Sequence, residues 1–259
     1  MIITITQTKS NSAAEFTVST NGKYTNWGQC PSIFKSFSCI LCDENRELIY
    51  QTKYQFINNL KNNIPYIWIF SEVHTKICSI LNPNNESIGS FEHVRTGWLG
   101  TYDNINFKNF NIKAYSISKG TNKNMLLFLG DKQIGQIVKS LCVMDNLDKY
   151  YLYLLDEYSQ LSQALSMFTL YYDNWNYGHQ LEYVKYKAVY QKEYTFSKYN
   201  KLYNPAWLSS NFNEIEIDNS KVTNSIKKSA KKLVIWFAIG WGIVLLIILI
   251  IFLVVYINS

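Results

Sequence analysis

Histidine is scarce in this chain of 259 residues, and the three that occur are far apart: His74, His93 and His179. None belongs to an HxxxH or HxE pattern, so neither a zinc site nor a histidine-based catalytic triad is indicated. Gly97-Trp98-Leu99-Gly100 lacks both the Lys-Ser/Thr pair and the following helix of a phosphate loop. We therefore predict no catalytic residues, no metal, no cofactor and no enzymatic activity.

Cysteine is also rare, and its five positions do not have the spacing of a disulfide framework: Cys30, Cys39, Cys42, Cys78 and Cys142. This usage predicts a reducing compartment. The pair Cys39 and Cys42 has the CxxC spacing of zinc sites, but no second CxxC or nearby histidine completes a set of four ligands. Two strand residues three positions apart face opposite sides of a sheet, so we interpret both thiols as packing residues.

One long stretch without any charged residue stands apart from the rest of the sequence, at residues 233–257. At about 1.5 Å per residue, a helix of this length exceeds the ~30 Å hydrocarbon core of a bilayer. Trp236, Trp241 and Tyr256 are aromatic residues suited to the two membrane interfaces. We expect a single transmembrane helix here, and no other run is long enough to span.

The charges that flank this run predict its orientation. Lys227, Lys228, Lys231 and Lys232 precede it and no charge follows it, which places the preceding domain in the cytosol. The first residues have neither a basic region nor an apolar core, so we expect no secretory signal. The prediction is a tail-anchored, single-pass protein of the cell membrane. Its juxtamembrane lysines are expected to contact anionic lipids.

The formal net charge of +6 owes much to that lysine cluster. The remaining lysines are scattered singly, a pattern that does not favour nucleic acid as a partner. Aromatic residues make up 16% of the chain, with 20 tyrosines, a composition typical of strands. We therefore expect a mainly β (α+β) domain before the anchor.

Three stretches of that domain each read as an antiparallel hairpin with a polar turn. They cover residues 37–56, 76–94 and 125–141, with turns at 43–46, 82–85 and 130–132. Residues 66–72, 109–117 and 150–155 read as further strands, and residues 1–36 as one or two strands with a loop. So many short strands predict a closed barrel or a sandwich, which removes exposed edges.

A helix is predicted at residues 157–172, because the hydrophobic period changes there from two to between three and four. The apolar positions share one face: Tyr158, Leu161, Leu165, Phe168, Tyr172 and Trp175. Since the helix is apolar over more than half of its circumference, we expect the sheet to enclose it. The alternative is a helix packed across one face of an open sheet.

Three motifs give the domain a resemblance to a known family. These are D-x-x-x-E-L-I from Asp43, G-D-K-Q-I-G-Q-I from Gly130, and Y-Y-L-Y-L-L-D from Tyr150 before the apolar helix. Over residues 37–178 the chain resembles the tubby C-terminal-like superfamily, which includes the LURP-one-related and phospholipid scramblase folds, and is most similar to bacterial tubby-like proteins. The resemblance implies a barrel of about a dozen strands around a central hydrophobic helix. The phosphoinositide-binding pair of tubby proteins and the calcium segment of scramblases match no positions here, so no lipid specificity is carried over.

The segment between the helix and the anchor is read as two parts. Residues 179–210 form an added helix or strand pair, and a helix would carry a tyrosine stripe: Tyr183, Tyr186, Tyr190 and Tyr194. Residues 211–232, rich in Asn, Ser, Glu and Lys, are expected to be a linker. The predicted segments are thus 1–36, 37–178, 179–210, 211–232 and 233–257.

These features predict a membrane-tethered binding module whose barrel recognises a lipid headgroup or a protein partner at the membrane. One alternative, implied by the resemblance, is lipid movement of the scramblase type. Another is a viral envelope protein whose β domain lies outside the membrane.

Overall fold

The structure is a computed structural model, and it describes residues 1–9, 13–31, 38–55, 72–144, 147–177 and 188–213, together with Ile239, Trp241 and Gly242. The chain divides into two compact units, Met1–Ile217 and Asp218–Ser259. All the strands and helices with assigned bounds belong to the first unit.

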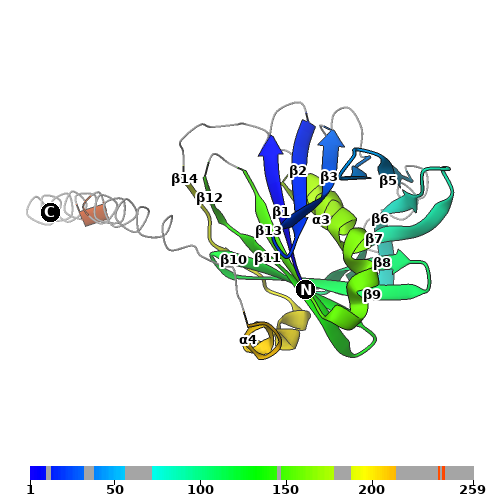
Figure 1. The fold of residues 1–259 in the computed structure, drawn as a ribbon. Helices are drawn as coiled ribbons and strands as arrows, with labels where there is room; N and C mark the ends of the chain where they lie inside the picture. The colour runs from blue at the N-terminus through cyan, green and yellow to red at the C-terminus, as the bar shows by residue number, and fades with distance from the viewer. Residues whose placement is uncertain are drawn as a thin grey trace, which may run out of the picture. The chain divides into compact units, whose positions relative to one another are not determined.

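That first unit is built on one antiparallel sheet. Its strands follow the chain in this order: β1 (Ile2–Lys9), β2 (Ala13–Thr20), β3 (Lys23–Pro31), β4 (Ile40–Asp43), β5 (Leu48–Tyr54), β6 (Glu72–Leu81), β7 (Ser87–Thr96), β8 (Thr101–Phe107), β9 (Phe110–Gly120), β10 (Asn122–Leu129), β11 (Lys132–Ser140) and β13 (Lys149–Leu154). The order around the sheet runs β10-β11-β13-β1 and then from β2 to β9 in sequence, and β9 pairs again with β10. The described strands thus form a closed, antiparallel, 12-stranded barrel (Figure 1).

Closure of the sheet confirms the barrel prediction, and the three predicted hairpins are present as β4–β5, β6–β7 and β10–β11. Their turns contain residues with positive φ: Arg46 at 68°, Asn85 at 62° and Gly130 at 60°. Asparagine and glycine tolerate this conformation better than other residues, so two of these turns follow ordinary turn chemistry. Glu72, the last residue of the predicted strand 66–72, begins β6, and residues 66–71 lie outside the described part.

The N-terminal strands are part of the barrel. The sequence predicts one or two strands at residues 1–36, apart from the barrel domain, but the described part of this segment contains three. Of these, β1 pairs with β13 and β3 pairs with β4. These strands belong to the same sheet, since Ile5 pairs with Tyr150 and Gln29 pairs with Ile40. The division at residue 37 is therefore not a structural boundary, because pairing between distant strands leaves no local signal in the sequence.

A helical segment is found where the sequence predicts one. The 3-10 helix η1 (Asp156–Leu161) leads into α3 (Ser162–Asn176), which extends four residues beyond the predicted end at residue 172. Every residue from Ala164 to Asn174 is buried, so the helix is covered on all sides. Ser166 and Thr169 donate hydrogen bonds of 2.8 Å to carbonyl oxygens one turn earlier, which satisfies their hydroxyl groups inside the core.

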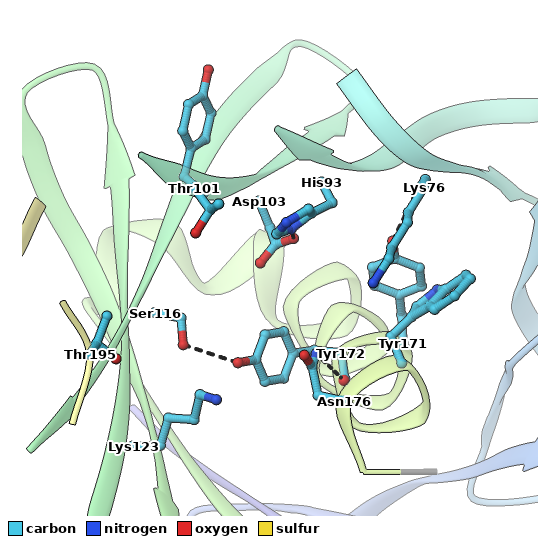
Figure 2. Close-up of a pocket in the computed structure, with 12 residues that line it drawn as sticks. Lys76, His93, Thr101, Asp103, Ser116, Lys123, Tyr171, Tyr172, Asn176 and Thr195 are labelled. Carbon is cyan, nitrogen blue, oxygen red and sulfur yellow. Dashed lines mark hydrogen bonds and ion pairs between the residues drawn. The ribbon is translucent and has the colours of Figure 1, made fainter. Parts of the chain in front are cut away.

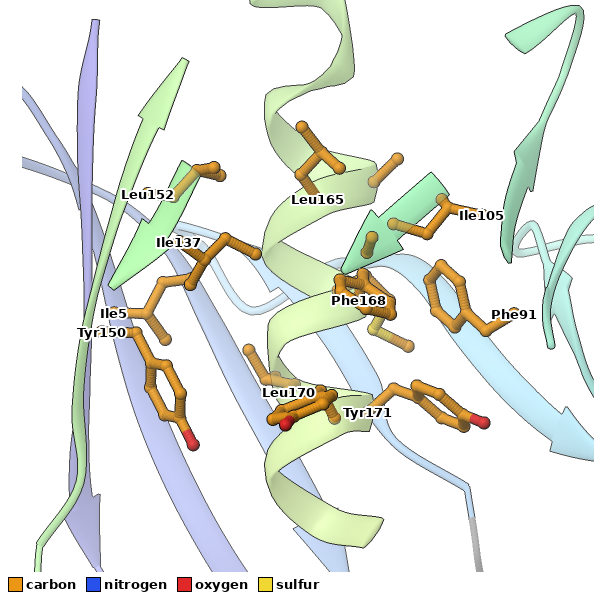
Figure 3. Close-up of a cluster of buried hydrophobic side chains, with 14 of the residues drawn as sticks. Ile5, Phe91, Ile105, Ile137, Tyr150, Leu152, Leu165, Phe168, Leu170 and Tyr171 are labelled. Atoms are coloured by element: carbon orange, nitrogen blue, oxygen red, sulfur yellow. The ribbon is translucent and has the colours of Figure 1, made fainter. Parts of the chain in front are cut away.

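The main hydrophobic core lies between α3 and the inner faces of the strands (Figure 3). Phe168 contacts Phe91 of β7 with ring centroids 5.5 Å apart, while Ile5 and Leu152 approach the helix from the opposite wall. Gly28 of β3 allows a close approach of the helix to the strand, because a Cβ atom there would lie 2.1 Å from Cδ2 of Leu170. The alternation of inward apolar residues along each strand supplies this core.

Cysteines contribute to the same core. The described structure contains all five, and each is buried as a free thiol. Cys30 Sγ of β3 donates to Sγ of Cys39, the residue before β4, at 2.9 Å, a contact for which the sequence has no signal. Burial of Cys30 raises the pKa of its thiol, so the thiol form prevails.

The segment after α3 adds short strands and helices. These are β12 (Cys142–Met144) with β14 (Ala188–Tyr190), β15 (Glu193–Tyr194) beside β9, η2 (Lys198–Leu202) and α4 (Trp207–Asn211). The described part of residues 179–210 contains both strands and short helices, and its two strands pair with β12 and β9 and not with each other. Tyr190 and Tyr194 lie in strands, whereas Tyr183 and Tyr186 lie outside the described residues.

The predicted transmembrane run 233–257 and the linker 211–232 lie almost wholly outside the described residues. This applies to the predicted membrane-surface residues Lys227, Lys228, Lys231 and Lys232, and to Trp236 and Tyr256. Trp241 is described, and its side chain is exposed. No helix within the described part has the length and apolar character needed to cross a membrane.

Candidate functional site

A cavity of about 270 Å³ opens beside the last turns of α3 (Figure 2). The helix contributes Tyr171, Tyr172, Trp175 and Asn176. The facing wall comes from five strands, β6 to β10, and from Thr195 after β15; its residues are Lys76, His93, Thr101, Tyr102, Asp103, Ser116 and Lys123. The barrel and its enclosed helix thus bring together side chains that are distant in sequence.

Lys76 occupies an irregular position in β6. The register with β7 pairs Thr75 with His93 and then Cys78 with Phe91, so an extra residue is accommodated at Lys76. Its φ of 50° is in the left-handed region, which is unfavourable for a lysine. β-Bulges redirect side chains and occur near functional sites, and this one places Lys76 in the cavity wall.

Two contacts with α3 accompany the bulge. Tyr171 donates its phenolic hydrogen to the carbonyl oxygen of Lys76 at 2.9 Å. The Nζ atom of Lys76 lies 4.8 Å from the ring centroid of Trp175, a cation–π contact. Partial burial lowers the pKa of Lys76, and the Asp103 carboxylate opposes that shift. The helix therefore fixes both the backbone and the ammonium group of this residue.

Lys123 supplies a second ammonium group from the start of β10. It pairs with Glu193 at 3.3 Å and lies over the rings of Tyr172 and Tyr177, at 5.6 Å and 5.4 Å. Burial pulls the pKa of Lys123 down, but Tyr172, Tyr177 and Glu193 outweigh it, and the net direction is upward. This side chain therefore remains a cation at neutral pH.

The other polar groups of the wall are mostly hydrogen-bonded to one another. His93 Nδ1 lies 2.9 Å from Asp103 Oδ1, and Ser116 Oγ lies 3.0 Å from the hydroxyl of Tyr172. Asn176 donates to the carbonyl oxygen of Tyr172 at 2.8 Å, near the end of the helix. Because a helix C-terminus carries partial negative charge, it favours the two lysines that lie around it.

The arrangement suits a small group with negative oxygen atoms. Two ammonium groups and several hydroxyl donors line the cavity, while the one carboxylate in the described lining, Asp103, is engaged by His93. Ammonium groups and hydroxyls are the usual donors to phosphate and carboxylate oxygens. In the part of the chain that the structure covers, no cluster of three or more His, Cys, Asp or Glu side chains could hold a metal ion.

A buried charged network lies next to this cavity. Asp173 of α3 accepts a 2.5 Å hydrogen bond from Tyr150, and Lys139 of β11 pairs with Asp148. The Nζ atom of Lys139 also lies 3.7 Å from the ring centroid of Tyr177, which Lys123 contacts from the cavity side. Burial and the nearby charge of Asp148 raise the pKa of Asp173 to about 8.

Of the residues that the sequence predicts to contact the membrane, Trp241 alone is among the described residues, and it belongs to the second compact unit. His93, which the sequence marks neither as a metal ligand nor as a triad member, lies in the wall beside Asp103. His74 contacts Glu92 at 2.6 Å, and His179 lies outside the described residues. Lys76 and Lys123 were missed because each is an isolated lysine in a strand. Neither spacing nor composition marks them, since their proximity depends on barrel closure.

Comparison with known proteins gave no match to any family model, to any curated protein or to any solved structure.

Proposed function

We propose that this protein is a membrane-tethered binding module whose barrel cavity takes the phosphate-bearing headgroup of an anionic lipid. The observation that carries the proposal is the strained bulge at Lys76, which directs an ammonium group into a cavity that also holds Lys123. Backbone strain of this kind persists where the surrounding structure enforces it, often at binding sites.

The membrane part of the proposal rests on the sequence. Residues 233–257 contain no charge and are long enough to span a bilayer, and four lysines precede them. The resemblance to tubby-like proteins supports a module of this class, because it implies a barrel around a hydrophobic helix. Resistance to extraction from membranes with alkaline carbonate is the expected behaviour, and release into the soluble fraction would contradict the anchor.

Binding is tested with the full chain in detergent micelles, titrated calorimetrically with glycerol 3-phosphate and with inorganic phosphate. We expect saturable binding of glycerol 3-phosphate that Lys76→Met weakens by about 10-fold or more, because hydrogen bonds to charged groups contribute about 1.5–3 kcal/mol. Lys123→Met should weaken it as well.

Lys53→Met is the matched control, since Lys53 is an exposed lysine of β5 outside the cavity lining. It should leave the affinity unchanged. Equal affinities in the Lys76→Met and Lys53→Met variants, or no saturable binding in the unaltered chain, would disprove the proposed site.

A further inference from the structure

The barrel unit exposes large hydrophobic side chains at two places that are distant in sequence. Trp98 is 79% exposed and Leu99 59% exposed, both in the turn between β7 and β8. Tyr194 of β15 is 64% exposed and Phe196 is 82% exposed. Among the described residues of this unit, only Tyr24, at 38%, joins them as an exposed large hydrophobic residue. Exposed aromatic residues grouped in this way usually mark an interaction surface.

Hydrogen bonds hold the two places together as one surface. The backbone N–H of Lys198 donates to the carbonyl oxygen of Leu99 at 3.1 Å, and Ser197 Oγ donates to the same oxygen at 3.0 Å. Gly100 follows Leu99, and a Cβ there would lie 2.2 Å from the carbonyl oxygen of Thr96, so the turn has no room for a side chain at this position. We call Trp98, Leu99, Tyr194 and Phe196 the rim patch.

The rim patch borders the cavity. Two cavity-lining residues are close to the patch in the chain: Thr101 lies two positions after Leu99, and Thr195 lies between Tyr194 and Phe196. A second depression, of about 230 Å³, is lined by Arg95, Gly97 and Trp98 and shares His93 and Thr101 with the first. A molecule that covers the rim patch therefore reaches the entrance to Lys76 and Lys123.

Four basic residues lie close to the patch, and one half-exposed carboxylate, that of Glu72, lies opposite Thr96 before the turn. Lys192, Lys198 and Lys201 are exposed in the same segment as Phe196, and Arg95 lies beside Trp98. The acidic residue of this segment, Glu193, is engaged by Lys123 at 3.3 Å and by Ser118 at 3.1 Å. Aromatic and aliphatic side chains among lysines are typical of surfaces that enter the interface of an anionic bilayer.

We infer that the rim patch inserts into the headgroup region of an anionic membrane and presents the cavity to lipids there. The inference rests on the proposed function and deepens it, because it identifies a bilayer as the source of the phosphate group. Apolar side chains gain by leaving water at the interface, while the lysines approach the anionic surface. Barrel orientation then determines which headgroups reach Lys76.

The test uses the full chain in proteoliposomes, with an environment-sensitive bimane label at one position of each variant. Trp98→Cys and Phe196→Cys probe the patch, and Tyr24→Cys is the control on β3. The five native cysteines are buried, so the introduced residue is the one that reacts. Lipids with a spin label near the headgroup quench a probe that enters the interface.

We expect quenching at positions 98 and 196 in vesicles of phosphatidylglycerol, at least twofold less in vesicles of phosphatidylcholine alone, and none at position 24. An unquenched label at both patch positions in the anionic vesicles would overturn the inference. If burial of the label at these positions depended on protein concentration and not on lipid, the rim patch would be an interface with a second copy of this chain. That result would also overturn the inference.

Two variants separate this inference from the proposed function. Trp98→Ser combined with Phe196→Ser should retain calorimetric binding of glycerol 3-phosphate. Lys76→Met, labelled at position 196 through Phe196→Cys, should retain quenching by the bilayer. Binding of glycerol 3-phosphate without quenching would support the cavity site and disprove the membrane contact of the rim patch. Quenching without binding would support the membrane contact and disprove the cavity site.

Discussion

Tyr171, on the helix enclosed by the barrel, donates a 2.9 Å hydrogen bond to the backbone carbonyl of Lys76 in the wall. The bond joins the centre of the barrel to the one residue of β6 whose φ is positive. A carbonyl at a bulge has lost its partner in the sheet ladder, and a buried acceptor without a partner is costly. The helix therefore stabilises a backbone conformation that the strand alone would not favour.

Replacing Tyr171 by phenylalanine tests this coupling. The ring would keep its contact with Phe91, whose centroid lies 5.1 Å away, while the hydrogen bond would be lost. We expect thermal unfolding in detergent to show that the free energy of unfolding falls by about 1–2 kcal/mol. The affinity for glycerol 3-phosphate should also fall severalfold, because Lys76 is held less firmly. Tyr24→Phe, at a partly exposed position, is the control for both measurements, and an unchanged affinity in Tyr171→Phe would limit the bond to a role in stability.

The conformation of Lys76 itself gives a second prediction. Glycine adopts a φ of 50° without the steric cost that a side chain incurs, about 1–2 kcal/mol. Lys76→Gly should therefore be about 1 kcal/mol more stable than Lys76→Met, which retains the strain. Both variants lack the ammonium group and should bind glycerol 3-phosphate equally poorly. A Lys76→Gly variant less stable than Lys76→Met would show that packing of the apolar side chain outweighs the backbone strain.

The close approach of Gly28 and Leu170 gives a third prediction. In Gly28→Ala the new methyl group would lie 2.1 Å from Cδ2 of Leu170, which is fully buried. Leu170 would have to move within a filled core, so we expect a loss of about 1–3 kcal/mol in the free energy of unfolding. Combining Gly28→Ala with Leu170→Ala should cost less than the sum of the two single changes, because the smaller side chain leaves room for the methyl group. Strict additivity in this double-mutant cycle would contradict the contact.

Much of the barrel is predictable from sequence because its signals are local. The turns at Arg46, Asn85 and Gly130 lie between alternating strands, and the spacing of apolar residues around Phe168 identifies the helix.

Strand β8 has no such signal in the sequence and is not predicted from it. Its Asp103, Asn104 and Asn106 are unfavourable in strands. In the structure Asn106 donates to Ser90 and Glu92 of the neighbouring strand at 3.1 Å and 3.0 Å, and these cross-strand bonds replace the usual apolar pairing.

The candidate site is not predictable in the same way. Lys76 and Lys123 are 47 positions apart in the sequence, and they meet at one cavity because β6 and β10 flank the same end of α3. A bulge that places a lysine in the left-handed region has no sequence signal, because a left-handed conformation is predicted from glycine or asparagine and not from lysine. Composition could show that cations are present, but only the closed sheet determines which of them share a wall.

The buried carboxyl group of Asp173 leads to the fourth prediction, a dependence of stability on pH. Burial and the charge of Asp148 raise its pKa from 3.8 to about 8, so the folded protein binds a proton that the unfolded chain has released at neutral pH. A raised pKa in the folded state means that stability decreases as pH rises through this interval. The loss should begin near pH 4, continue to about pH 8 and then level off.

Asp173→Asn should remove this dependence. An asparagine resembles the protonated carboxyl group: its oxygen accepts from Tyr150, and its amide donates where the proton of the acid lies, towards Asp148. At pH 5 the variant and the unaltered chain should therefore have similar melting temperatures. At pH 8.5 the variant should be more stable by at least about 1.4 kcal/mol, the equivalent of a single pKa unit.

Asp131→Asn, at an exposed turn between β10 and β11, is the control and should retain the pH dependence of the unaltered chain. If Asp173→Asn and the unaltered chain lost stability in parallel between pH 5 and pH 8.5, the proton would have to reside elsewhere, and the network of Lys139, Asp148 and Tyr150 would hold Asp173 as a carboxylate.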